Sequence, residues 1–209
     1  MLDRIGIKEQ ARRLLNQRRS DAVLIYLVGT LVNIGAGAVI PGLGALLAIP
    51  IQAGMCLAFH KAWQERGAEI NDVFIPFKDY RRNLVGLLWP ALWVFLWSLL
   101  LVIPGIIKAI SYAMTPYILA DYPQVRDKEA LRLSMRMTRG RLGDIFVFYL
   151  SFIGWSILSA LTFGILEILF VGPYRGIASA GLYESLKADA LENGVITAEE
   201  LGMRRDGAA

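Results

Sequence analysis

The sequence has only one cysteine and one histidine among its 209 residues. A single cysteine excludes a disulfide within the chain. Cys56 lies inside an apolar stretch and His60 follows it, and neither has partners at the spacing that a metal site requires. We therefore expect no metal site and no cofactor.

Catalytic signatures are missing as well. The chain has no Gly-x-Ser-x-Gly nucleophile elbow and no glycine loop followed by Lys-Ser or Lys-Thr. Acid and base residues are almost absent from its apolar stretches. We therefore expect a protein that is not an enzyme, and a lipid-modifying enzyme is the least favoured of its possible functions.

The composition is that of a membrane protein. Hydrophobic residues make up 56% of the chain and its mean hydropathy is +0.48, which is too apolar for an ordinary soluble domain. The net charge of +4 would suggest nucleic acid in a soluble protein. Here, all 22 lysines and arginines except Lys108 and Arg175 lie outside the apolar stretches. Their position favours the positive-inside rule over a nucleic-acid partner.

Six apolar stretches predict an all-α bundle of six transmembrane helices, because most of them are long enough to cross a ~30 Å hydrocarbon core. They cover residues 22–40, 43–59, 84–103, 105–120, 145–163 and 165–183. The fourth is only about 24 Å long as a helix, so we expect it to cross a thinned region or to be protected by its neighbours.

Tight corners join the stretches into three hairpins. The corners are at Pro41-Gly42, Pro104-Gly105 and Gly164. The second helix of each hairpin, which we call its return helix, contains a proline. These prolines are Pro50, Pro116 and Pro173. Proline removes a helix hydrogen bond, so the sequence predicts kinked return helices that pack against protein, in hairpins related by an axis along the membrane normal.

The polar segments complete the predicted organisation. Residues 1–21 form a basic amphipathic helix, 22–183 the membrane domain, and 184–209 a polar cytoplasmic tail. Within the membrane domain, 62–83 and 121–143 are interfacial connections that contain amphipathic helices. Thr197 to Glu200 in the tail has the pattern of a capping box. Because the basic residues lie in these segments, we expect both termini in the cytoplasm and no cleavable signal.

Arginines form exposed faces on the amphipathic helices. They are Arg12, Arg13, Arg18, Arg19, Arg132, Arg136 and Arg139. We expect them to lie along the phosphates of the anionic inner leaflet, with the apolar face of each helix in the membrane. The face at 132, 136 and 139 has a second interpretation, the docking of a cytoplasmic protein.

Lys108 and Glu167 are ionisable residues inside predicted spans, where each costs roughly 2.5 to 3.5 kcal/mol at a helix centre. Each residue follows the corner of its own hairpin by a few residues, so we expect both to lie at a similar depth in the membrane. One hypothesis is that they pair and tie two hairpins together. The alternative is that both side chains reach the outer headgroups independently.

Arg175 is the deepest predicted intramembrane charge, and it follows Pro173 as Gln52 follows Pro50. Three roles are open. Arg175 donates to a carbonyl that the proline frees, or it lines a polar cavity for an anionic ligand, or it extends to the interface.

Several strings of the sequence resemble a known family. They are Val102 to Lys108, Tyr112 to Asp121, Glu129-Ala130 with Ser134, Leu150 to Trp155, and Pro173-Tyr174 with Tyr183-Glu184. They resemble the bacterial integral-membrane family catalogued as domain of unknown function 975, over about Lys8 to Leu186. The resemblance implies a bacterial cytoplasmic-membrane protein without an established activity. A more distant similarity is to the membrane portion of some glycerophosphodiester phosphodiesterases, whose catalytic domain this chain lacks.

The favoured function is that of a non-enzymatic integral membrane protein, a structural, lipid-interacting or accessory component. The alternative is a small transporter or export component with a midplane polar site near Arg175 and Gln52. The expected partners are membrane lipids, with a membrane protein or a second copy of the chain as a further possibility.

Overall fold

The computed structural model describes residues 3–39, 43–100 and 102–203, and these residues contain helices and no strand. This confirms the all-α class. The elements are α1 (Arg4–Gln17), α2 (Arg19–Val39), α3 (Leu43–Trp63), η1 (Ile70–Asp79), α4 (Tyr80–Leu100), α5 (Val102–Tyr112), α6 (Thr115–Asp121), α7 (Asp127–Thr138), α8 (Leu142–Leu150), α9 (Ile153–Leu161), η2 (Glu167–Val171) and α10 (Gly172–Glu192).

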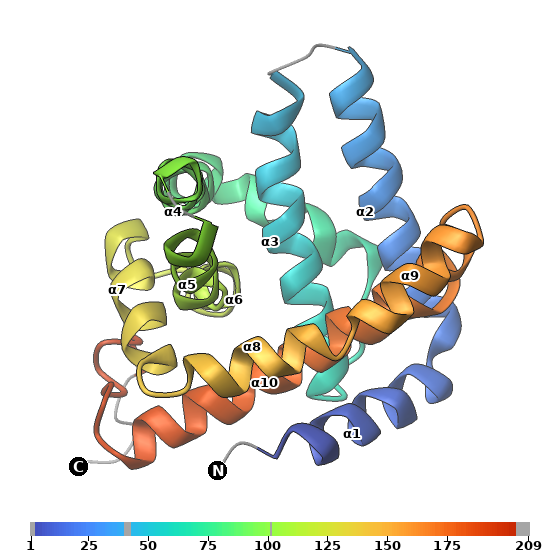
Figure 1. Cartoon of the computed structure of the whole chain (residues 1–209). Coiled ribbons are helices and arrows are strands. Elements are labelled where there is room, and N and C mark those ends of the chain that lie inside the picture. The colour runs from blue at the N-terminus through green and yellow to red at the C-terminus, as the bar shows by residue number, and fades with distance from the viewer. Residues whose placement is uncertain (1–2, 40–42, 101, 204–209) are drawn as a thin grey trace.

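Three hairpins are present, but they run in three different directions. In Figure 1, α2 and α3 run up the page, α4 and α5 are seen end on, and α8, α9 and α10 run across it. The expected arrangement about one membrane normal is therefore not seen. The turn at Gly164 lies where the sequence places it, with a φ of +82° that favours glycine. Pro104 and Gly105 lie in the first turn of α5, and the corner at Pro41-Gly42 is outside the described residues.

Two segments of the described chain are long and apolar enough to cross a membrane, judged by length and composition alone. They are Ile103–Asp121 and Leu142–Leu161. Each consists of two shorter helices, α5 with α6 and α8 with α9. The structure therefore supports an apolar, membrane-compatible character for these two segments and does not confirm six spans.

The prolines of the return helices occupy different positions. Pro50 lies within α3, which continues through it. Pro116 lies in the first turn of α6, directly after the break at residues 113–114 that separates α6 from α5. Pro173 lies inside a continuous helical run, because the π-helical turn η2 leads directly into α10. A proline that the sequence reasoning passed over, Pro90, lies inside α4.

Helix α10 forms the centre of the core. Most of its residues are buried, including Leu182, Tyr183 and Leu186, each with no exposed surface. Helix α1 packs against it, as Figure 1 shows. The apolar face of α1 is therefore covered by protein, through Ala11 and Leu15, and not by the membrane as predicted.

Large apolar side chains remain exposed on α4, α5, α8, α9 and the turn that follows α9. They include Leu92, Phe95, Leu96, Ile103, Leu150, Ile157, Leu161, Phe163 and Ile165. Trp89 and Trp93 point outward among them, with 48% and 40% of their surface exposed. Exposed apolar side chains in this number are compatible with contact with lipid or with another protein.

Candidate functional site

A cavity of about 400 Å³ lies where the return helices α3, α6 and α10 meet α2 and α8. Its lining mixes polar and apolar side chains. The polar ones are Tyr26, Thr30, Asn33, Gln52, Tyr117, Tyr149, Arg175 and Ser179, and the apolar ones include Met55, Cys56, Phe59 and Pro116. The structure thus places Gln52 and Arg175, which the sequence reasoning linked, in the wall of one cavity.

Glycines on α10 bring aromatic rings to this cavity. A Cβ atom on Gly172 would lie 2.2 Å from the Tyr26 ring, and one on Gly176 would lie 2.5 Å from the Phe59 ring. Any larger residue would push these rings away. The two glycines therefore let α2 and α3 seat their rings directly on the backbone of α10.

Arg175, in the wall of the cavity, forms an ion pair with Glu167. Arg175 Nη2 donates to Glu167 Oε1 at 2.7 Å, and the hydroxyl of Tyr26 donates to the same oxygen at 3.2 Å. The Arg175 side chain keeps 39% of its surface exposed. A guanidinium has five N–H donors. Arg175 can therefore bind an anion in the cavity while it holds Glu167.

The predicted pair between Lys108 and Glu167 is wrong. Glu167 pairs with Arg175, within its own hairpin. Lys108 lies instead with its Nζ 5.7 Å from the centre of the Tyr112 ring. The prediction assumed that two residues at the same distance from the corners of their hairpins lie close together. The hairpins run in different directions, so such residues lie in different parts of the structure.

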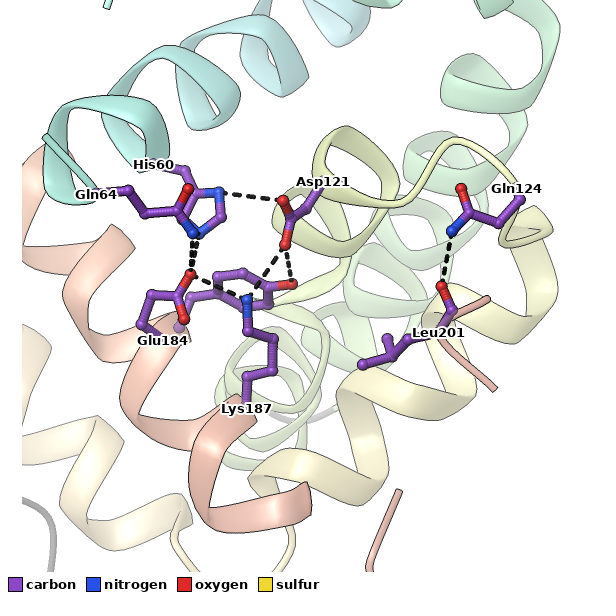
Figure 2. A network of polar contacts seen from close by, with 8 residues as sticks. His60, Gln64, Asp121, Gln124, Glu184, Lys187 and Leu201 are labelled. Carbon is purple, nitrogen blue, oxygen red and sulfur yellow. Dashed lines mark hydrogen bonds and ion pairs between the residues drawn. The ribbon is translucent and has the colours of Figure 1, made fainter. Parts of the chain in front are cut away.

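A buried charge cluster lies further along the same return helices (Figure 2). It consists of His60, Asp121, Glu184 and Lys187, with Tyr183 and Gln64 attached. His60 Nδ1 lies 3.5 Å from Asp121 Oδ1, and His60 Nε2 contacts Glu184 Oε1. Lys187 Nζ donates to Asp121 Oδ2 at 3.3 Å and to Glu184 Oε1 at 2.9 Å. We call this set the return-helix cluster.

The cluster shifts the ionisation of its members. Burial opposes the charge on Glu184, but hydrogen bonds from His60 and Lys187 outweigh it and lower the pKa of Glu184 to about 2. For Lys187, burial favours the neutral form, yet the hydrogen bond to Glu184 and the charge of Asp121 raise its pKa. Both side chains are therefore charged at neutral pH.

His60, Asp121 and Glu184 offer metal-ligand atoms that all lie within 4.8 Å of one another. The arrangement nevertheless fits a metal poorly. The ring of His60 places a different nitrogen against each carboxylate, whereas one ion binds one imidazole nitrogen. Lys187 already contacts both carboxylates. The positive charge that a metal ion would bring to the two carboxylates is therefore provided by Lys187.

Sequence reasoning missed this cluster. It treated His60 as a residue without partners, yet His60 is 2% exposed and has partners on two other helices. A signal was present: His60, Asp121 and Glu184 each come at the end of an apolar run. The fold was needed to show that these three ends meet.

The predicted membrane-surface arginines are exposed with one exception. Arg12, Arg13, Arg18, Arg19, Arg132 and Arg139 are exposed. Arg136 is half-buried and donates to Glu200 Oε1 at 2.5 Å and to the carbonyl of Val195. Arg136 therefore holds the C-terminal segment instead of facing lipid. The capping box there is present, with reciprocal bonds between Thr197 and Glu200.

Comparison with known proteins identifies one family. Residues 73–190, more than half of the chain, match the family described as Protein of unknown function (DUF975). No curated protein and no solved structure matches the chain, and the similarity to glycerophosphodiester phosphodiesterases is not shown. The matched residues include α6 and most of α10, two of the three helices that form the cavity and the return-helix cluster. The chain belongs to the DUF975 family.

Proposed function

We propose that this chain is a non-enzymatic integral membrane protein that binds an amphiphile, with the anionic head of the ligand in the cavity beside Arg175. The observation that carries the proposal is the cavity itself. Its wall combines Arg175 and Gln52 with apolar side chains such as Met55 and Phe59. A site of this mixed chemistry suits a molecule with a charged head and an apolar tail.

The size of the cavity supports this ligand class. Its volume of about 400 Å³ falls in the range of roughly 300–1,000 Å³ typical of small-molecule sites. A planar guanidinium binds a phosphate or a carboxylate through two parallel hydrogen bonds. The exposed apolar side chains of α4, α5, α8 and α9 provide the lipid environment from which such a ligand would come.

The location we propose is the bacterial cytoplasmic membrane, with several spans and both termini in the cytoplasm. The exposed arginines of α1 and α7 support this orientation, because cytoplasmic segments are rich in basic residues. They would interact with the anionic inner leaflet. A membrane-protein partner or a second copy of the chain belongs to the same proposal, and detergent-free sizing in nanodiscs would test it.

Binding of lipids in nanodiscs tests the amphiphile site. The probes are phosphatidylglycerol, with an anionic head, and phosphatidylcholine, with a zwitterionic one. We expect selective binding of phosphatidylglycerol that Arg175→Gln weakens about tenfold, as loss of a hydrogen bond to a charged group does. Glu167→Gln should strengthen binding, because it frees Arg175 from its present partner.

Arg139→Gln is the matched control, since Arg139 is exposed and outside the cavity wall. Equal loss in Arg139→Gln and Arg175→Gln would mean that the chain binds anionic lipid by general surface charge. That result, or equal binding of the two lipids by the unaltered chain, would overturn the proposed site.

The second candidate function is a small transporter. The observation that favours it is that Gln52 is exposed while Phe59, on the same helix and in the same cavity wall, is 3% exposed. The cavity is thus accessible toward Gln52 and closed toward Phe59. The test introduces single cysteines along α3 and α10 in a Cys56→Ala background and treats each variant with an impermeant thiol reagent. Labelling along one helix face as far as Gln52 and Arg175 would show an aqueous path.

A further inference from the structure

We propose that the return-helix cluster is a latch that closes the Arg175 cavity on the side of the chain termini, so that opening the latch gives the cavity access from that side. This inference rests on the proposed function, because it describes how the same binding site is gated.

The cavity and the cluster lie next to each other. Both are built from α3, α6 and α10. The cluster residue His60 lies roughly two helical turns, or ~12 Å, along α3 from Gln52 in the cavity wall. Tyr117 lines the cavity, and its ring stacks on Tyr183 with the ring centres 5.3 Å apart. The hydroxyl of Tyr183 in turn donates to Asp121 at 3.2 Å.

The layer between the two sites is tightly packed. Phe59 is 3% exposed, Tyr117 6% and Tyr183 not at all. The edge of the His60 ring meets the Tyr183 ring, with the centres 5.2 Å apart. Aromatic rings therefore separate the cavity from the charged groups.

Every ion pair that joins two helices in the cluster crosses between different hairpins. His60 is on α3, Asp121 on α6, and Glu184 and Lys187 are on α10. Two carboxylates, an ammonium and an imidazole thus hold the ends of three return helices together. The Arg175–Glu167 pair in the cavity differs, since both residues belong to one hairpin. The cluster thus joins all three hairpins through ion pairs, whereas the cavity pair is linked to another hairpin through the Tyr26 hydroxyl.

Helix α6 is a short element that joins the cavity wall to the cluster. It has seven residues, it is separated from α5 by the break at residues 113–114, and Asp121 is its last residue. Segments at such breaks absorb the backbone changes of hinge motions. Arg82 of α4 donates to the carbonyls of Leu119 and Tyr122 and so keeps the end of α6 attached to its own hairpin. Loss of the contacts of Asp121 would therefore remove the ion pairs between α6 and the return helices of the other two hairpins.

The chain carries its own reporter for this motion. Cys56, its one cysteine, lines the cavity and is 5% exposed. Membrane vesicles of each orientation, treated with an impermeant methanethiosulfonate reagent, would show the side from which Cys56 reacts. We expect the unaltered chain to react slowly from the side of the termini. The Asp121→Asn, Glu184→Gln double variant should react about tenfold faster from that side, because local opening becomes easier.

Asp189→Asn is the matched control. It breaks the ion pair (2.6 Å) between Asp189 on α10 and Arg141, the residue before α8, and neither residue lines the cavity. The labelling rate of Cys56 should not change in this control. If the double variant is not recovered folded, as judged by a monodisperse elution profile, Lys187→Gln alone replaces it, with the same expected direction.

An unchanged labelling rate in a folded latch variant would overturn the latch. Phosphatidylglycerol binding is measured on the same samples. If the lipid binds to the unaltered chain and labelling does not change, the latch fails and the proposed function stands. If labelling changes and the lipid does not bind to the unaltered chain, the proposed ligand fails, and with it the latch as a gate for that ligand.

Discussion

Two ion-pair sites on the return helices differ in the burial of their cations and in what they connect. At the cavity, Arg175 keeps 39% of its side-chain surface exposed and pairs with Glu167 of its own hairpin. In the return-helix cluster, Lys187 keeps 10%, and it pairs with Asp121 of another hairpin as well as with Glu184 of its own helix. A cation that remains exposed is free to contact a further group, whereas a buried cation with partners on two helices holds those helices together, and the predictions below test this difference.

The largest expected effect is the loss of a cluster carboxylate. Glu184→Leu removes one partner of both His60 and Lys187 and leaves Asp121 as the remaining carboxylate of the cluster. An uncompensated buried charge costs about 3–5 kcal/mol, and we expect about 2 kcal/mol here because Asp121 remains. Thermal unfolding in detergent should show a clearly lower Tm, and Glu192→Gln, an exposed site on the same helix, should show little change. Equal Tm values for the two variants would mean that the cluster does not clamp the helices.

A smaller effect is expected at the floor of the cavity. Gly176→Val would place side-chain atoms against the Phe59 ring, where a Cβ already comes within 2.5 Å. Overpacking of this kind costs typically about 1–3 kcal/mol. We also expect weaker phosphatidylglycerol binding, because the displaced ring enters the cavity. Gly143→Ala is the control, since a Cβ there meets open space among the described residues. Unchanged phosphatidylglycerol binding by Gly176→Val would mean that Phe59 does not contribute to the binding site.

Acid should destabilise the cluster. The pKa of Glu184 is about 2 in the fold against an ordinary value of 4.5. A lowered pKa contributes stability that is fully present above the ordinary value and is lost as the pH falls toward the folded one. The Tm should therefore fall between pH 4.5 and about 2. Glu184→Gln should flatten this dependence, and an unaltered slope in that variant would assign the acid lability to other carboxylates.

The smallest expected effect concerns the C-terminal segment. Arg136→Gln removes the contacts to Glu200 and to the carbonyl of Val195. Both partners of the ion pair are about 40% exposed, so we expect a change of only a few tenths of a kcal/mol. Limited proteolysis near Thr197 should accelerate while the global Tm stays nearly constant. Arg132→Gln, at an exposed position on the same helix, should leave proteolysis unchanged.

Helix positions followed closely from local patterns. The apolar runs, the turn at Gly164 and the capping box at Thr197 are all signals within a few residues of one another, and the structure contains each of them. The amphipathic pattern of α1 correctly separated buried from exposed positions. It did not tell what covers the apolar face, because a protein helix and a lipid surface attract the same side chains.

Partners across the chain did not follow from local patterns. The sequence reasoning linked Gln52 with Arg175 by their shared position after a proline, and both line one cavity. The same kind of reasoning paired Lys108 with Glu167, and there it was wrong. A repeated pattern identifies residues at equivalent positions within their own helices. Whether two such residues are in contact also depends on the direction in which each hairpin runs.

The sequence by itself determined that the chain is all-α and rich in apolar helices, because helix period, turn residues and composition are local properties, and its strings of matching residues placed it in the DUF975 family. Only the tertiary structure decided that the ends of α3, α6 and α10 meet. That meeting depends on hairpin directions set by packing over the whole chain. It gives His60 its partners and places Arg175 at a cavity.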